Sequence, residues 1–397
     1  MATITQIKNI LSRKFRGATL DDVQGISNWT VFEEAGHNLL SEIDPYETIR
    51  HGEIDLFQEI YDYGLSTTAP DLKGKKVIDL RPQGERSSYD DFRQTYIEDF
   101  DREKKIIDNW FSVEFDEATK FLRVAKSVSN SVTVTDVESS NYTAGTGVSN
   151  ITEDTILELE DDKSIRFDVS SGTNLITWAG TAVDISDHTN KSSFFMEVYF
   201  PDSSIISSVK LRIGSSATDY YEITGSIHFG SIRNGVNLYR FDWNGVSDAG
   251  TTDEDNIDYA RLEITTTSAD TDIRIGKLSS KLPEPFELVY YSNALFRPTS
   301  GSTWLTLPTA DTDILNLEGE AQNIFIYECC EIIASDLQLD VEKQKYHDEL
   351  HGTPQRQGLY DQYKHNKPNE PIRPTTRYYD PPVRNFRRRY WNPPQRQ

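Results

Sequence analysis

The β-strand pattern that decides the fold lies between residues 155 and 278. Its segments read TILELE (155–160), SIRFDV (164–169), SFFMEVYF (193–200), SVKLRIGS (208–215), DYYEIT (219–224), NLYRFDW (237–243), YARLEIT (259–265) and DIRIGKL (272–278). Apolar and polar residues alternate within the segments, and clusters of Gly, Ser, Thr, Asp and Asn separate them. Short alternating strands at such spacing are typical of antiparallel sandwiches. We therefore predict a β-sandwich over residues 129–281.

The segments on either side of this region have a different character. Ile4, Ile7 and Leu11 share one helical face, so an amphipathic helix is expected at the start of the chain. Further helices are expected over residues 88–110 and 320–350. The stretches FSVEF (111–115) and KFLRVA (120–125) predict two strands joined in a hairpin. Helices mixed with short strands before and after a sandwich favour an α+β body that carries the sandwich as an insertion.

The predicted fold class is thus an α+β body with an inserted antiparallel β-sandwich (jelly roll) and an extended C-terminal arm. A length of 397 residues also favours more than one core. The expected domains are the N-terminal part of the body (1–128), the jelly roll (129–281), the helical and extended remainder of the body (282–352), and the arm (353–397).

Composition narrows the class of protein. A formal net charge of −23 disfavours a general nucleic-acid coat protein, because phosphate binding needs clustered Lys and Arg. The only cysteines, Cys329 and Cys330, are neighbours and cannot readily form a relaxed disulfide, so we expect small buried residues in a protein made under reducing conditions. The sequence predicts neither a signal peptide nor a membrane span.

The last segment of the chain is a basic arm on an acidic body. It is rich in Pro and interleaves Arg with aromatic residues, which are typical anchors of protein interfaces. DNA contact and simple disorder are the alternatives. The residues expected to bind a partner are Arg373, Arg377, Tyr378, Tyr379, Arg384, Phe386, Arg387, Arg388, Arg389, Tyr390 and Trp391.

Residues 131–281 resemble the galactose-binding-like jelly rolls of tailed-phage virion proteins and carbohydrate-binding modules. The stretches TDVESSNYTAG (135–145), LELEDDKSIRFDVSSGT (157–173), VKLRIGSSATDYYEI (209–223) and residues 235–278 carry this likeness. The run from Leu288 to Leu337 resembles the segment that follows such jelly rolls in phage neck and connector proteins. The resemblance implies a virion component assembled as a ring with the portal or tail, and no catalytic residues.

Two weak ligand sites can be named within the jelly roll. Asp253, Asp255 and Asp258 could supply hard oxygen ligands for a structural calcium ion, with a solvated loop as the alternative. Jelly-roll modules of the resembling family sometimes hold such an ion. Trp178, Tyr221 and Trp243 could stack on sugar rings, with the sandwich core as the alternative. No other cofactor is expected.

His347 and His351 form the only histidine pair at helical i,i+4 spacing, which can place two imidazoles on one face for a metal. The stretch HDELH departs from the HExxH order, and the sequence offers no third ligand, so an exposed polar helix end is expected. The chain also lacks GxSxG, a P-loop and GxGxxG after a strand, so no enzyme is predicted.

The expected function is therefore a non-enzymatic structural protein of the virion, a subunit of a ring or collar near the phage head-to-tail junction. Its expected partners are portal, adaptor or tail proteins and copies of itself, and its expected location is the virion after synthesis in the host cytoplasm. The alternative is a receptor- or glycan-binding tail protein that uses the jelly roll to bind a host-surface glycan.

Overall fold

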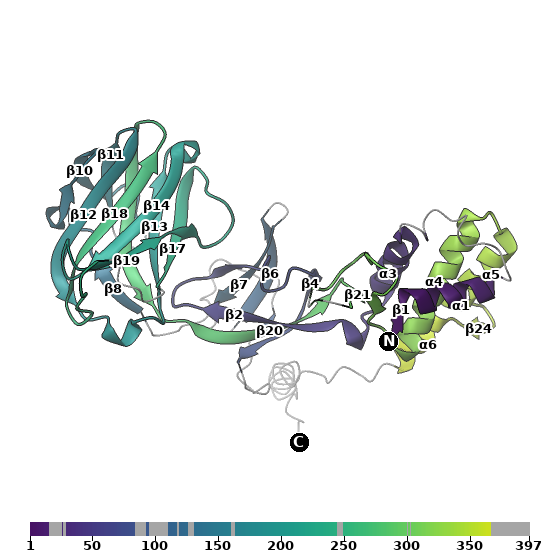
Figure 1. Cartoon of the computed structure of the whole chain (residues 1–397). Coiled ribbons are helices and arrows are strands. Elements are labelled where there is room, and N and C mark those ends of the chain that lie inside the picture. Colours follow the sequence, from purple (N-terminus) through teal and green to yellow (C-terminus); the bar gives the residue numbers. More distant parts are fainter. Residues whose placement is uncertain are drawn as a thin grey trace, which may run out of the picture.

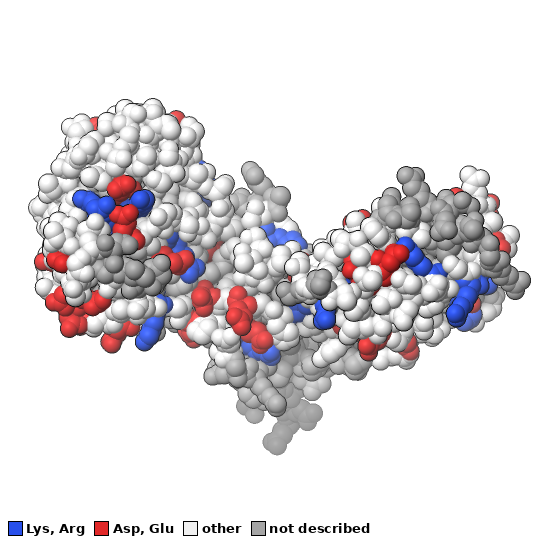
Figure 2. Space-filling view, in the orientation of Figure 1, with Lys and Arg blue, Asp and Glu red and all other residues white. Residues whose placement is uncertain are grey.

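The computed structural model describes residues 1–15, 26, 29–83, 93–94, 110–116, 119–125, 131–159, 163–243, 249–299, 301 and 303–366. Figure 1 shows three parts in a row: a β-sandwich, a middle region of long strands, and a helical lobe that contains the N-terminus. No described helix is long and apolar enough to span a bilayer. Acidic side chains gather along the lower side of the sandwich and the adjoining region in the view of Figure 2.

The sandwich consists of two antiparallel sheets. The seven-stranded sheet has the order β10-β11-β19-β13-β17-β16, with β8 pairing β19. Its strands are β8 (Ser131–Thr135), β10 (Val148–Asp154), β11 (Ser164–Val169), β13 (Ser193–Phe200), β16 (Ser226–Ile227), β17 (Gly235–Asp242) and β19 (Asp270–Lys281). The five-stranded sheet has the order β15-β14-β18-β12-β9. Its strands are β9 (Tyr142–Ala144), β12 (Gly172–Val183), β14 (Ile206–Gly214), β15 (Tyr220–Thr224) and β18 (Ile257–Thr266).

Alternation along the strands builds the sandwich core. In β14, Val209, Leu211 and Ile213 are buried, while the residues between them are half-buried. The antiparallel sandwich is therefore confirmed. The strand expected over residues 155–160 is not formed. Strand β10 ends at Asp154, and the Asp154 carboxylate accepts a hydrogen bond from the Ile156 backbone amide at 2.8 Å, which turns the chain. That turn leaves the Ile156 side chain exposed. The sequence pattern also did not predict strand β12 of the five-stranded sheet.

Two small sheets form the middle region. One has the order β2-β20-β4, with β2 (Ile49–Leu56), β20 (Glu284–Ser292) and β4 (Leu72–Pro82). The other has the order β3-β7-β6-β5, with β3 (Asp62–Gly64), β7 (Thr119–Ala125), β6 (Trp110–Asp116) and β5 (Arg93–Gln94). The antiparallel β6–β7 pair is the hairpin expected from the sequence. Most of the helix expected over residues 88–110 lies outside the described residues, and β5 and Trp110 are strand.

The helical lobe brings the two ends of the described chain together. It contains α1 (Ile4–Lys14), α3 (Thr30–Glu42), α4 (Gly319–Asp336), α5 (Asp340–His351) and α6 (Leu359–Asn366). The short strands at its border are β1 (Ala2–Thr3), β21 (Phe296–Arg297), β22 (Ile314–Leu315), β23 (Gly352–Thr353) and β24 (Arg356–Gln357). The helix expected over residues 320–350 is two helices, because the chain turns at Leu337–Leu339, where Gln338 has a φ of 56°. Cys329 and Cys330 are buried free thiols, as expected.

The segments before and after the sandwich share two hydrophobic cores instead of one. Residues of α1 and α3 pack with residues of α4, α5 and α6 in the helical lobe. A second core joins the strands of the middle region, with β20 between β2 and β4. The expected single α+β body is thus two packed units along the chain.

An aromatic contact joins the sandwich to the middle region. Phe195 of β13 is fully buried in the core of the middle region, although its strand belongs to the sandwich. Its ring centroid lies 4.9 Å from that of Phe57 and 5.4 Å from that of His228. Phe194, the preceding residue, points the other way into the sandwich core. One strand therefore contributes to both cores, because neighbouring side chains of a strand face opposite sides.

We predict that Phe195→Ala loosens the junction, with a loss of about 3–5 kcal/mol in the free energy of unfolding, typical of large cavities. Hydrogen exchange should rise in residues 57–65 while the sandwich strands stay protected. Phe194→Ala is the matched control, because it removes an equal side chain from the sandwich core. Faster exchange confined to the sandwich in Phe195→Ala would contradict the assignment.

We predict that acid weakens this junction through His228. Burial, with Arg240 nearby, lowers the pKa of His228 to about 4 in the folded protein. The unfolded chain takes up the proton near pH 6.5 and the folded chain only near pH 4, so stability is lost as pH falls through that window, by on the order of 3 kcal/mol.

Urea unfolding across this pH window checks the expectation. His228→Phe should flatten the fall in stability, whereas His37→Phe, at an exposed position on α3, should leave the wild-type slope. Equal slopes in wild type and His228→Phe would rule out His228 as the titrating group.

Candidate functional site

A cleft of about 540 Å³ lies at the junction of the sandwich and the middle region. The turn that leads into β3 forms one wall, and β13, β17, β19 and the β16–β17 loop form the other. Its lining residues are Glu59, Ile60, Tyr61, Asp62, Glu197, Ile227, His228, Phe229, Ser231, Arg233, Val236, Asn237, Leu238 and Lys277. The volume falls in the range of small-molecule and ligand-fragment sites.

Tyr61 is the exposed aromatic side chain of this cleft. It is 46% exposed, and its hydroxyl has no hydrogen-bond partner among the described residues. Its backbone is held in place, since the Val124 amide donates to the Tyr61 carbonyl at 2.7 Å. Glu59, two residues earlier, has a φ of 60°, so the chain turns sharply before the tyrosine. The turn presents an aromatic ring to solvent on a fixed backbone.

The apolar side of the cleft continues from Tyr61 to Phe229, which is half-buried. The ring centroid of Phe229 lies 4.7 Å from that of Phe121 on β7. This contact holds the β16–β17 loop of the sandwich against the middle region. The cleft therefore has one exposed ring and one supported ring from different parts of the chain.

The polar groups of the cleft divide into engaged and available ones. Asp62 accepts two hydrogen bonds from Arg123 at 2.7 and 2.8 Å. The Asn237 side chain is bonded to the backbone of residues 233 and 235. Lys277, in contrast, has no ion pair or hydrogen bond among the described residues. Glu59 is exposed and forms an ion pair with Lys281 at 3.5 Å, which leaves part of its carboxylate open to solvent. An exposed ring beside available donors and acceptors suits a ligand that has both apolar faces and hydroxyl groups.

The three aromatic residues proposed for glycan stacking lie in the sandwich core, so the prediction that they form a sugar-binding surface is wrong. Trp178, Tyr221 and Trp243 are each at most 5% exposed. The Trp178 indole donates to Asp136 at 3.2 Å, and the Tyr221 hydroxyl donates to Glu254. Burial, with Glu254 beside it, raises the pKa of Tyr221 to about 12. Rings enclosed in this way present no face to a sugar.

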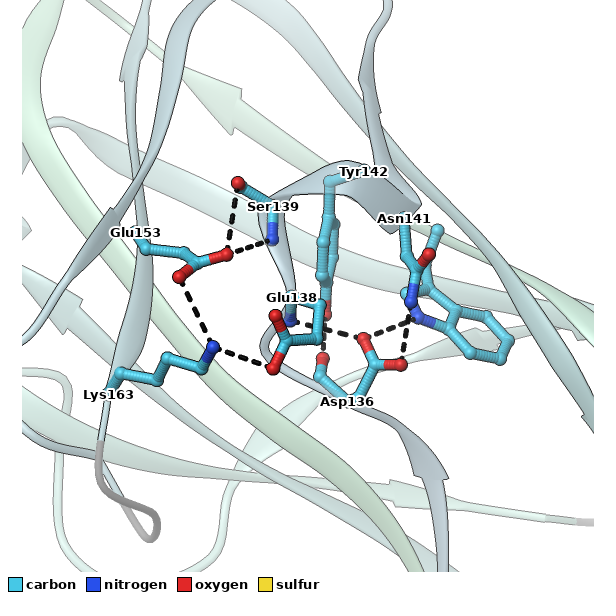
Figure 3. Close-up of polar contacts among 8 residues, drawn as sticks. Asp136, Glu138, Ser139, Asn141, Tyr142, Glu153 and Lys163 are labelled. Atoms are coloured by element: carbon cyan, nitrogen blue, oxygen red, sulfur yellow. Dashed lines mark hydrogen bonds and ion pairs between the residues drawn. The ribbon is translucent and has the colours of Figure 1, made fainter.

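A polar network surrounds the β8–β9 connection (Figure 3). Lys163 contacts Glu138 at 2.6 Å and Glu153 at 3.2 Å, and Glu153 accepts hydrogen bonds from Ser139. Asp136 accepts from the Asn141 side chain at 2.7 Å. Because these groups already bond to one another, the network fixes a loop and leaves few free groups for a ligand.

The proposed calcium ligands do not form a cluster. Asp253 and Asp255 are exposed, and the Asp253 carbonyl accepts a turn hydrogen bond from Asn256. Among the described residues, one group of three possible ligand side chains has its ligand atoms within 4.8 Å of one another, and it contains neither these residues nor Asp258. That group is Glu331, His347 and His351. The solvated loop is the interpretation that fits Asp253, Asp255 and Asp258.

The sequence indicated the histidine pair but not its third member, and it gave no indication of Tyr61. Glu331 lies on a different helix, and Tyr61 stands in a turn without a motif. The proposed partner-binding arm, Arg373 to Trp391, lies outside the described residues, so its binding stays a prediction.

No family model matches the chain, and no curated protein matches it. Among solved structures, the chain is similar to a family 30 carbohydrate-binding module of a cellulosomal cellulase from Clostridium thermocellum (7% identity, TM-score 0.28, 39% of this chain and 96% of the module). It is also similar to a family 11 module from Clostridium thermocellum in complex with a β-1,3-1,4-mixed-linked tetrasaccharide (13% identity, TM-score 0.27, 39% of this chain and 96% of the module). A third similar structure is a xylan-binding domain from Paenibacillus barcinonensis (12% identity, TM-score 0.25, 38% of this chain and 92% of the domain). Each likeness spans most of the other domain and less than half of this chain.

Proposed function

We propose that the protein binds a glycan in the cleft at the junction of the sandwich and the middle region. The observation that carries this proposal is the exposed Tyr61 ring, whose hydroxyl has no partner among the described residues, in the wall of a 540 Å³ cleft. A sugar ring stacks its C–H face on an aromatic ring and offers hydroxyl groups around its edge. Lys277 supplies a donor for those hydroxyls, and the exposed carboxylate of Glu59 supplies an acceptor beside its ion pair with Lys281.

The charges of the lining favour a neutral sugar chain. Carboxylates and cations both line the cleft, and Asp62 is already paired with Arg123. A cleft without a dominant sign of charge gives no electrostatic preference to an anionic or cationic ligand. The ligand class is therefore a hydroxyl-rich neutral oligosaccharide.

We further propose that the role is binding without catalysis, since the sequence offers no catalytic motif. The ring or collar subunit of a virion, with portal or tail partners, remains a prediction from sequence resemblance. No observation on the described residues favours that role or a location in the virion over the glycan-binding alternative. The mass of the full-length chain in solution would test the expected self-association.

We predict that Tyr61→Ala weakens glycan binding by about fivefold or more, because stacking on one aromatic ring contributes on the order of 1 kcal/mol beyond its buried area. A glycan array with the full-length chain identifies the ligand, and calorimetry then gives the affinity of each variant. Tyr46→Ala is the matched control, since Tyr46 is 74% exposed and lies outside the cleft.

The single variant Lys277→Met should also weaken glycan binding, because it removes a hydrogen-bond donor from the cleft. It should leave the fold unchanged, because the Lys277 ammonium has no partner among the described residues. Saturable binding that is equal in wild type and Tyr61→Ala would place the site elsewhere. No binding to any glycan by the wild type would reject the proposed function itself.

A further inference from the structure

The helical lobe holds a side-chain cluster that the proposed glycan site does not use. Glu331 lies on α4, and His347 and His351 lie one turn apart on α5. The chain reverses between these helices, and α5 packs along α4. This reversal brings a carboxylate beside a histidine pair that is 16 residues further along the sequence.

The geometry of the cluster is compact. The Nδ1 atom of His347 lies 3.1 Å from Oε1 of Glu331, and the two imidazole centroids are 4.5 Å apart. The possible ligand atoms of all three residues lie within 4.8 Å of one another. Ligands of a tetrahedral zinc ion, at about 2.0–2.2 Å from the metal, are separated by roughly 3.4 Å. Small side-chain rotations therefore suffice to bring the three groups around one ion.

Buried neighbours fix the orientation of the helix that carries the histidines. Tyr346 and Leu350 are buried in the helical core, and each directly precedes one of the two histidines. The anchored residues hold His347 and His351 on the edge of α5 that faces Glu331. The His351 ring also lies 5.4 Å from the ring of Tyr360, whose hydroxyl donates to the buried Glu328 at 2.6 Å. The ligand set is thus supported by packed residues around it.

The other acidic residues of the HDELH stretch are engaged elsewhere. Asp348 accepts a hydrogen bond from Gln344 at 2.7 Å, and Glu349 pairs with Arg356 at 2.9 Å. Glu331 is therefore the carboxylate that faces the histidine pair. It is 19% exposed, against 48% for His347, so the cluster opens to solvent on one side.

We propose that Glu331, His347 and His351 bind a divalent transition metal ion, with zinc as the expected occupant and water in the remaining position. Two imidazoles and one carboxylate match the ligand preference of zinc and its neighbours, whereas calcium and magnesium prefer all-oxygen sites. The ion joins α4 to α5, so it stabilises the helical lobe and leaves the glycan cleft unchanged. It binds the folded chain better than the unfolded chain, because only the fold brings the three ligands together.

The test uses the full-length chain without a histidine tag, stripped of metal, and titrated with Zn²⁺ by calorimetry. We expect one ion per chain and a rise in the midpoint of thermal unfolding when zinc is added. Titration with Co²⁺ should give visible absorption bands whose intensity reports four-coordinate geometry. Magnesium at the same concentration should have no effect.

Variants assign the ligands. Removing an outer-shell partner alone costs about 10- to 100-fold in metal affinity, so His347→Ala, His351→Ala and Glu331→Gln should each weaken zinc binding at least that much. His37→Ala, at an exposed histidine of α3, is the control and should bind as the wild type does. Circular dichroism of the metal-free variants verifies that the lobe is folded.

Two outcomes would overturn the site. One is a wild-type chain that shows no zinc binding at millimolar metal. The other is binding that all three variants retain, which would locate the ion on other residues.

Discussion

A buried ammonium group fixes how the sandwich meets the rest of the molecule. Lys281 ends β19 and is fully buried, with its Nζ donating to the Gln58 carbonyl at 2.9 Å and lying 3.5 Å from the Glu59 carboxylate. A buried charge is costly unless it is paired and hydrogen-bonded, so the turn that contains residues 58 and 59 must stay against β19. Only Leu282 and Pro283 then separate β19 from β20, the central strand of the next sheet.

The same constraint places the candidate glycan cleft. The turn held by Lys281 begins with Phe57, whose ring packs on Phe195, and continues to Tyr61 at the cleft wall. Lys277, on the opposite wall, comes from the same strand as Lys281. The cleft is therefore formed by two parts of the chain. A sandwich cut out as residues 129–281 lacks the wall formed by Glu59, Ile60, Tyr61 and Asp62, so ligand binding must be judged on the full chain.

The sandwich could be predicted from the sequence because alternation along a strand directly reports a two-faced environment. Alternation does not say which face is the core. Trp178, Tyr221 and Trp243 proved to be inward-facing, while Tyr220, next to Tyr221, lies half-buried with Arg212 over its ring. The cleft and the third member of the candidate metal cluster, Glu331, could not be predicted, because each depends on residues that only the folded chain brings together, such as Tyr61 with Lys277. Local spacing carries no information on such pairs.

The helical lobe also explains why a metal ion would select histidines over the two cysteines. Thiolates are strong zinc ligands, but the thiol must first lose its proton. Burial raises the pKa of Cys330 to about 12 and that of Cys329 well above its usual value. Both thiols therefore stay protonated inside the core that contains Phe325 and Ile333. Glu331 directly follows the two cysteines on α4. Its side chain reaches solvent and contacts His347. The apolar face of α4 thus holds the lobe together, while its outer edge supplies a ligand that water and metal can reach.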